Sequence, residues 1–385
     1  MLEETRLEMQ GRNTGLRVIL LIGLVSLLGD ATYEGGRSVV PELFRALGLT
    51  AAGVGAIVGL AELGGWIARP VGGYLTEKVG RADLIVRAGY AALLVVPLMA
   101  FAPSWEVLAV LVFAERLARG LRIPPRDAML ARLRGEVRSG TAFGIHELLD
   151  QVGAAGGPLL ITLALLIHNG DVRTALLYSL MPYAALLFVL TRLPSYTVER
   201  PTDLVEEKGK SLHLYILAAS LNVAGLIPVQ LLLYRMSQVA GEGSWLVPAA
   251  YTLAMVTDAA AAPLLGRLYD RFGTSAIALA MVLSVTPPLF VTFSVADLLL
   301  ASALAGVVIG AQESIYRAAV ADLAGIRRIG TAYGFFGLGI GVGSAAAGLG
   351  FGWMMDLGLD RFHLVAYAAA FQAASILLLM WSRRK

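Results

Sequence analysis

Residues 73–81 read GYLTEKVGR and residues 266–273 read GRLYDRFG, so two distant stretches of the chain spell nearly the same loop. Both follow one pattern: a glycine, three residues, an acid, a base, one residue and a second glycine. Each stretch lies between two long apolar runs. A short charged loop that recurs at about half the chain length predicts a duplicated bundle of membrane helices.

The composition supports a membrane protein. Of the 385 residues, 57% are hydrophobic and only 15% are charged, and the mean hydropathy is +0.72. Because a spanning helix needs about 20 apolar residues, a chain of this length holds about twelve of them and no sizeable soluble domain. The polar stretch 1–17 lacks the pattern of a cleaved signal peptide, so we expect the first helix to be retained.

Several function classes are excluded by what the sequence lacks. There is no cysteine, which rules out disulfides and thiolate metal sites, and four scattered histidines argue against a tight metal site. The sequence shows no Ser-His-Asp set and no phosphate-binding glycine loop, because its glycine runs lie in predicted membrane helices and not after strands. We therefore do not expect an enzyme. We expect no cofactor, no metal and no nucleic-acid partner.

The apolar runs predict an all-α integral membrane protein with 12 transmembrane helices in two pseudo-symmetric six-helix bundles. Turn residues mark the breaks, and the longest polar stretch, 194–212, predicts a cytoplasmic linker between an N-terminal bundle, 1–193, and a C-terminal bundle, 213–385. The predicted helices are 17–44, 51–77, 82–102, 105–131, 140–168, 172–193, 213–239, 245–268, 274–294, 297–323, 330–356 and 361–382.

Lysine and arginine predict the orientation. With the N-terminus inside, the outer loops hold only Arg45, Arg173 and Arg361, and the inner segments hold most of the others. This asymmetry predicts that both termini are cytoplasmic. The richness in alanine, glycine and arginine suggests a GC-rich prokaryotic gene, so we expect a multi-pass protein of the prokaryotic cytoplasmic membrane.

The duplication extends to a second motif, because residues 140–144 read GTAFG and residues 330–334 read GTAYG. At this point the chain resembles the major facilitator superfamily over its whole length. The loop at 73–81 is similar to the family pattern G-x-x-x-D-R-x-G-R, with Glu77 and Lys78 at the charged positions, and Asp270 and Arg271 occupy them in the second copy.

Two further motifs carry the resemblance. Arg116-x-x-x-Gly120 in the fourth predicted helix is similar to the family's arginine motif there. Gly144-x8-Gly153-x3-Gly157-Pro158 in the fifth is similar to the signature of proton-driven exporters. The eleventh helix keeps a relic of the same small-residue pattern, so helix packing is an equal explanation for it.

The resemblance implies a gate role for the repeated loops. Acid–base contacts from them to neighbouring helix ends would hold the outward-open state, although the loops also set the topology. The predicted gate motif comprises Gly73, Glu77, Lys78, Gly80, Arg81, Gly266, Asp270, Arg271 and Gly273.

Charged residues inside membrane helices are functional candidates by default, because an ionisable group costs several kcal/mol there. Asp30 and Glu34 share one helix face, and two close carboxylates cannot both ionise easily, which suits a proton carrier. The resemblance places Asp30 near Arg116. A static pair of Glu34 with Arg37 is the structural alternative.

The fifth predicted helix holds a second candidate proton site. His146 and Asp150 are one turn apart, and histidine titrates near neutral pH. A purely structural pair, with Arg69 as a further partner, is an equal alternative. The sequence thus predicts proton coupling by Asp30, Glu34, Arg116, His146 and Asp150. The predicted substrate-binding residues are Arg37, Glu62, Glu147, Asn222, Gln230, Asp258 and Gln312.

Together with the charged membrane residues, the resemblance implies a proton-coupled antiporter that exports small organic compounds by alternating access. We expect it to be a monomer in lipid whose partners are a small-molecule substrate and protons. The alternatives are proton-coupled symport of an organic anion into the cell, which the arginines of the fourth helix would suit, and a lipid or glycolipid flippase. A transporter-shaped sensor without flux is disfavoured by the intact loops in both halves.

Overall fold

The computed structural model describes residues 2–132, 139–197, 210–324 and 329–382. Within these ranges the regular secondary structure is helical, apart from one isolated antiparallel bridge between Arg81 and Thr197, and short turns and loops connect the helices. Most of the predicted linker 194–212 lies outside the described residues.

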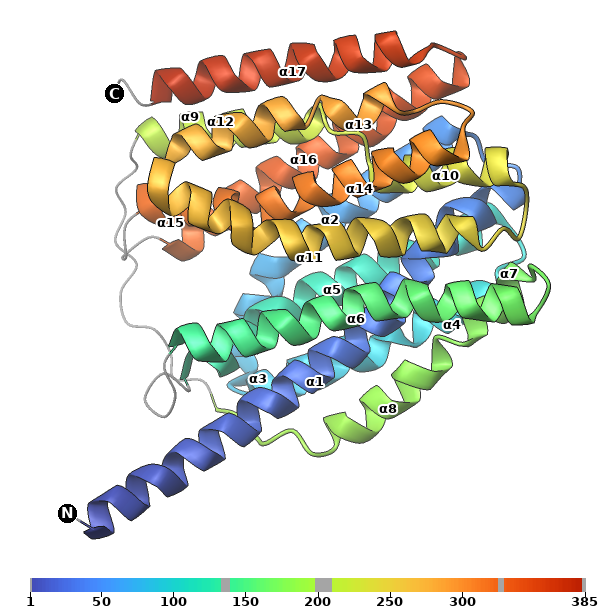
Figure 1. Cartoon of the computed structure of the whole chain (residues 1–385). Coiled ribbons are helices and arrows are strands. Elements are labelled where there is room, and N and C mark those ends of the chain that lie inside the picture. The colour runs from blue at the N-terminus through green and yellow to red at the C-terminus, as the bar shows by residue number, and fades with distance from the viewer. Residues whose placement is uncertain (1, 133–138, 198–209, 325–328, 383–385) are drawn as a thin grey trace.

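The described helices form twelve spans, as the sequence predicts, and they lie roughly parallel in one bundle (Figure 1). The first six spans are α1 (Leu2–Ala46), α2 (Ala51–Val79), α3–η1–α4–η2 (Ala82–Ala91, Ala92–Leu94, Val95–Leu98, Met99–Phe101), α5 (Trp105–Arg132), α6 (Ser139–Ile167) and α7–α8 (Val172–Leu177, Leu180–Leu190). The last six are α9–α10 (Lys210–Ala224, Val229–Ala240), α11 (Leu246–Phe272), α12–α13 (Thr274–Leu283, Thr286–Leu289), α14–η4–α15 (Val295–Ala311, Gln312–Tyr316, Arg317–Ala324), α16 (Ile329–Asp356) and α17 (Arg361–Ser382).

Ten of these spans are long and apolar enough to cross a membrane. Of the other two, α5 carries many charged residues and α12–α13 is short. The seventh span is interrupted, although the sequence predicts one continuous helix there, and proline explains the break. Pro228 has no N–H to donate and adopts extended backbone, so α9 ends at Ala224 and α10 begins after it.

The last glycine of each repeated loop ends a helix. Gly80 has φ 70° and its N–H donates to Thr76 at 2.9 Å, and Gly273 has φ 56° and donates to Tyr269 at 2.7 Å. Glycine adopts this left-handed backbone without the cost that a side chain imposes. The repeated pattern therefore has a local structural cause as well as any role in a gate.

Small residues bring the spans into backbone contact. Gly55 of α2 faces the carbonyl of Gly348 of α16 so closely that a Cβ at either position would collide with backbone. In α6, Gly153 and Gly157 face the backbone of α1 in the same way. Close approach of this kind is typical of helix packing in lipid, and it gives Gly153 and Gly157 a packing role.

We call the end of the bundle with the chain termini the termini end, and the opposite end, with the loops 47–50, 241–245 and 357–360, the far end (Figure 1). At the far end, hydrogen bonds join the first six spans to the last six. Arg45 donates to Ser237 at 2.9 Å, and the N–H of Gly243 donates to buried Glu42 at 2.6 Å.

A third contact at the far end is a helix cap that crosses between the two sets of spans. Asp356, the last residue of α16, accepts hydrogen bonds of 2.9 Å from the N–H groups of Ala51 and Ala52 at the start of α2. The first N–H groups of a helix have no partner within it, so a carboxylate there is stabilising. The far end is therefore closed in this conformation.

Candidate functional site

Asp30 of α1 and Asp150 of α6 belong to one buried polar cluster between α1, α5 and α6. Asp30 is 8% exposed, and Asp150 and Arg119 lie near enough to interact with it electrostatically. Arg126 of α5 lies 3.6 Å from the carboxylate of Asp150 and 3.3 Å from the hydroxyl of Ser26. The structure thus joins the two candidate proton sites that the sequence places on separate helices.

His146 completes this cluster. Its Nε2 lies 2.9 Å from the Ser26 hydroxyl, and its Nδ1 lies 3.7 Å from Asp150. Ser26 in turn lies 3.0 Å from the hydroxyl of Tyr90. A chain of hydrogen-bonding groups with carboxylates, a histidine and an arginine can hold and pass a proton.

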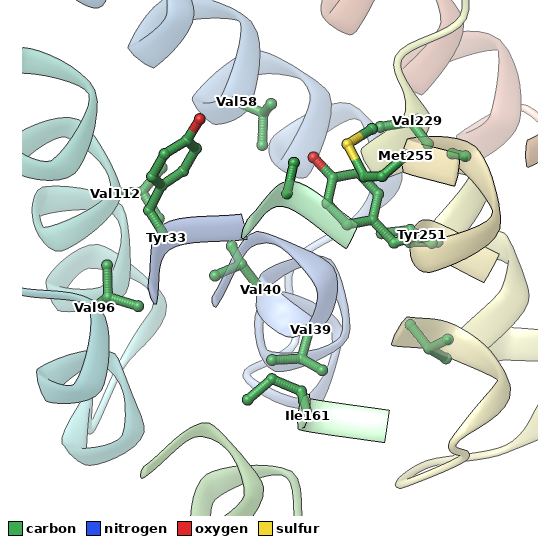
Figure 2. Packing of buried hydrophobic residues seen from close by; sticks show 14 of the residues in the cluster. Tyr33, Val39, Val40, Val58, Val96, Val112, Ile161, Val229, Tyr251 and Met255 are labelled. Atoms are coloured by element: carbon green, nitrogen blue, oxygen red, sulfur yellow. The ribbon is translucent and has the colours of Figure 1, made fainter. Parts of the chain in front are cut away.

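Glu34 makes other contacts. Its carboxylate binds Arg37 at 2.9 Å, as in the structural alternative, and also accepts a 2.6 Å hydrogen bond from the hydroxyl of Tyr251 of α11. Tyr251 lies in the buried cluster beside Met255, across the bundle from Tyr33 (Figure 2). Glu34 therefore connects the first six spans to the last six.

The structure does not place Arg116 as the partner of Asp30. Arg116 lies 2.8 Å from Glu62 of α2 and also binds its neighbour Glu115. Arg119, three residues further along α5, is near enough to interact electrostatically with Asp30. Arg119 also lies 4.9 Å from the ring of Tyr33. The sequence signal for Arg119 is a stripe of charged residues that share one face of α5, because they are spaced four, three and four residues apart: Glu115, Arg119, Arg122 and Arg126. This spacing does not single out Arg119 among them.

A cavity of about 340 Å³, including the space at its mouth, lies among α1, α2, α4 and α5, and Gln230 of α10 is the lining residue that comes from the last six spans. Arg37, Glu115, Arg116 and Gln230 supply its polar lining, and apolar side chains such as Val58 supply the rest. Gln230 is 6% exposed, and its amide nitrogen has no partner among the described residues. Two predicted substrate residues, Arg37 and Gln230, therefore line one cavity.

The other predicted substrate residues are dispersed. Asn222 is buried and donates to Gln372 of α17 at 2.5 Å, so it holds α9 to α17 and does not face the cavity. Asp258 is 3% exposed on α11 and lies within reach of Gln151 of α6. Glu147 is exposed, and Gln312 begins the π-helical turn η4 and is half-buried.

Among the described residues, His146, Glu147 and Asp150 have donor atoms within 4.8 Å of one another, the spacing that a metal ion needs. Two of the three are engaged by protein groups, since His146 contacts Ser26 and Asp150 lies beside Arg126. The arrangement matches a proton-exchanging network as well as it matches a metal site.

The charged residues of the repeated loops face outward. Glu77, Lys78, Asp270 and Arg271 are exposed. Arg81 binds Asp83 with two hydrogen bonds of 2.8 and 2.7 Å and so stabilises the start of α3. A contact that holds the outward-open state would form in a conformation other than this one.

Comparison with known proteins identifies the family. The sequence model of the Major Facilitator Superfamily matches residues 19–241. An uncharacterized protein of Mycobacterium tuberculosis, Rv2265, is 32% identical over 376 residues, which cover 93% of this chain and 91% of that one. The MFS-type transporter MJ1317 of Methanocaldococcus jannaschii is 27% identical over 214 residues, 53% of this chain and 52% of that one.

Solved structures agree with this fold. A POT family transporter in complex with a thioalcohol-conjugated peptide superimposes with a TM-score of 0.76 at 12% identity, covering 96% of both chains. The nucleoside transporter NupG superimposes with a TM-score of 0.70 at 12% identity, covering 95% of this chain and 98% of that one. The chain is a multi-pass membrane transporter of the major facilitator superfamily.

Proposed function

We propose that this secondary transporter is coupled to protons and that Asp30 and Asp150 form its proton site. The observation that carries the proposal is the buried cluster that brings a carboxylate of α1 and one of α6 together. Asp150 lies 3.6 Å from Arg126 and 3.7 Å from His146, and both of these groups contact Ser26, one helical turn before Asp30 on α1. Two acids that share such a site hold a single negative charge more readily than two, so the pair can exchange one proton.

The closed far end supports alternating access. We assign the termini end to the cytoplasm of a prokaryotic cell, because the arginines and lysines of the connecting segments concentrate there. In this assignment the conformation faces inward. Residues 1–193 and 213–385 would then move as two bodies of a monomer, joined by the linker 194–212, when the far-end contacts break.

Antiport with export is the coupling mode that we propose first. The glycines of α6 that resemble the exporter signature pack against α1, the interface that carries Asp30 and Asp150. Because α6 packs against α1 at the proton site, movement of α6 would change the surroundings of Asp30 and Asp150. A solute that occupies the cluster after the proton leaves would be exchanged against protons.

A second candidate, symport of an organic anion, is favoured by the position of Arg119. Arg119 acts on both Asp30 and Glu62. An anion bound to Arg119 would weaken its attraction for the Asp30 carboxylate, which favours a proton on Asp30. Anion and proton would then bind together and move in the same direction.

Proteoliposomes with an internal pH-sensitive dye test the proposal. Drug-like cations, organic acids and sugars are added one at a time under an imposed proton gradient. Antiport predicts that a solute moving in one direction drives protons in the other, and symport predicts movement in the same direction. Either flux is lost in Asp30→Asn and Asp150→Asn. Solute transport without any proton movement in the wild type would contradict proton coupling.

A further inference from the structure

We propose that Arg69, Arg119 and Trp66 form a subsite for the anionic group, a carboxylate or a phosphate, of the transported solute. The inference deepens the proposed transport function by naming the chemical class of the solute. It concerns residues that the sequence does not single out as substrate ligands.

The subsite lies in a second cavity, of about 210 Å³ including its mouth, between α2 and α5. Three arginines, Arg69, Arg116 and Arg119, line this cavity together with a single acid, Glu62. Positive charge therefore exceeds negative charge on its walls. In the low dielectric of a membrane bundle, an excess of this kind attracts anions and repels cations.

The single acid is already engaged. Glu62 lies 2.8 Å from Arg116, which also binds Glu115. Within the described part of the chain, no carboxylate oxygen lies within 4.0 Å of Arg69 or Arg119. Neither guanidinium group thus forms a direct ion pair, and acids such as Glu62 and Asp30 act on Arg119 only from further away. A ligand that brought a carboxylate or a phosphate to the two groups would supply the missing direct contact.

Aromatic rings support the two arginines from one side. The guanidinium carbon of Arg69 lies 3.5 Å from the centre of the Trp66 ring, and that of Arg119 lies 4.9 Å from the Tyr33 ring. Ring stacking holds a guanidinium plane by its face and leaves the N–H edge available. Both arginines are half-buried, so this edge can reach a ligand, and its geometry suits the two oxygens of a carboxylate or phosphate.

The subsite also touches the other set of spans. Arg317 of α15 is the charged group that acts most strongly on Arg69, and Trp66 packs against Gly337 of α16. Like charges on facing spans oppose closure of the termini end. An anion between them would remove that repulsion, so its binding would favour the closed arrangement at that end.

Binding to the purified full-length protein at fixed pH, without any gradient, tests the subsite. The probes are benzoate, succinate and inorganic phosphate as anions, tetraphenylphosphonium as a cation and glucose as a neutral solute. Isothermal titration gives the affinity, and tryptophan fluorescence reports the surroundings of Trp66. Arg69→Gln and Arg119→Gln remove the charges, and Arg69→Lys keeps one.

Arg192→Gln is the matched control, because Arg192 also stacks on a ring, 4.7 Å from Phe188, but is exposed at the end of α8. We expect at least one anion to bind, with a tenfold or greater loss of affinity in Arg69→Gln and Arg119→Gln, a smaller loss in Arg69→Lys and less than twofold change in the control. Trp66→Phe should remove most of the fluorescence response.

The proposal is overturned if no anion of the panel binds, if only the cation or glucose binds, or if anions bind Arg69→Gln and Arg119→Gln as tightly as the wild type. The assay involves no proton movement. Failure of the subsite is thereby separated from failure of proton coupling, which the liposome experiment measures with Asp30→Asn and Asp150→Asn.

Discussion

Glu34 of α1 and Tyr251 of α11 are joined by a 2.6 Å hydrogen bond that crosses from the first six spans to the last six. Both side chains are almost fully buried. Since water is excluded there, the carboxylate depends on Arg37 and Tyr251 for its partners. This bond must break if the two sets of spans separate at this level.

Tyr251→Phe should therefore lower the stability of the folded protein by about 1 kcal/mol, the upper range of hydrogen bonds between membrane helices. It should also raise the rate of exchange between conformations. Tyr183→Phe is the control, because its hydroxyl donates to Ala91 within the first six spans. Unfolding in mixed micelles measures the first effect. Equal effects of both variants on exchange rates would contradict the role of Glu34 and Tyr251.

A bulky residue at Gly55 should open the far end. A side chain there collides with the backbone of Gly348, so Gly55→Leu forces α2 from α16. The chain has no cysteine, so a single Val40→Cys on α1, buried in this conformation, reports access from the far end. We expect several-fold faster maleimide labelling in Gly55→Leu. Gly156→Leu, on a glycine that faces open space, should leave labelling unchanged.

Loss of the helix cap that Asp356 provides to α2 should also open the far end. Asp356→Ala removes two hydrogen bonds, and loss of a helix cap costs about 1 kcal/mol. Because the cap joins the two sets of spans, that loss should shift the population toward the form open at the far end. Asp171→Ala removes a cap within the first six spans. The same labelling assay should respond to Asp356→Ala and not to Asp171→Ala.

The pair of Arg116 with Glu62 should matter for folding. Arg116→Gln leaves buried Glu115 and half-buried Glu62 without their base, and removal of one partner of a buried pair costs about 3–5 kcal/mol. Adding Glu62→Gln to that variant should restore part of the stability. Thermal unfolding in detergent measures both. A double variant as unstable as the sum of the two single variants would show that the pair is not coupled.

Apolar run length and turn residues were enough to predict the spans. The predicted helices 51–77 and 361–382 correspond to α2, Ala51–Val79, and α17, Arg361–Ser382. The interruption before Pro228 was not predicted, because the run around it is mostly apolar and long enough to form one continuous helix. The ninth span was predicted to reach residue 294, but its helix α13 ends at Leu289, directly after two prolines.

The partners inside the bundle could not be predicted from spacing. Arg116 and Arg119 are three positions apart and differ by roughly 60° around the helix axis. A small rotation of α5 therefore decides which of them faces Asp30, and the packing of Gly120 against α2 sets that rotation. The proximity of Asp30 and Asp150 depends in the same way on helix packing, because Gly153 sets how closely α6 approaches α1.

Exchange without a gradient tests proton coupling most directly. Liposomes loaded with a transported solute are diluted into the labelled solute, and counterflow is compared with gradient-driven transport for the wild type and Asp150→Asn. We predict that Asp150→Asn loses gradient-driven transport at least tenfold but keeps counterflow, since exchange needs no proton step. Gradient-driven transport that survives in both Asp150→Asn and Asp30→Asn would contradict the proposal that this pair carries the proton.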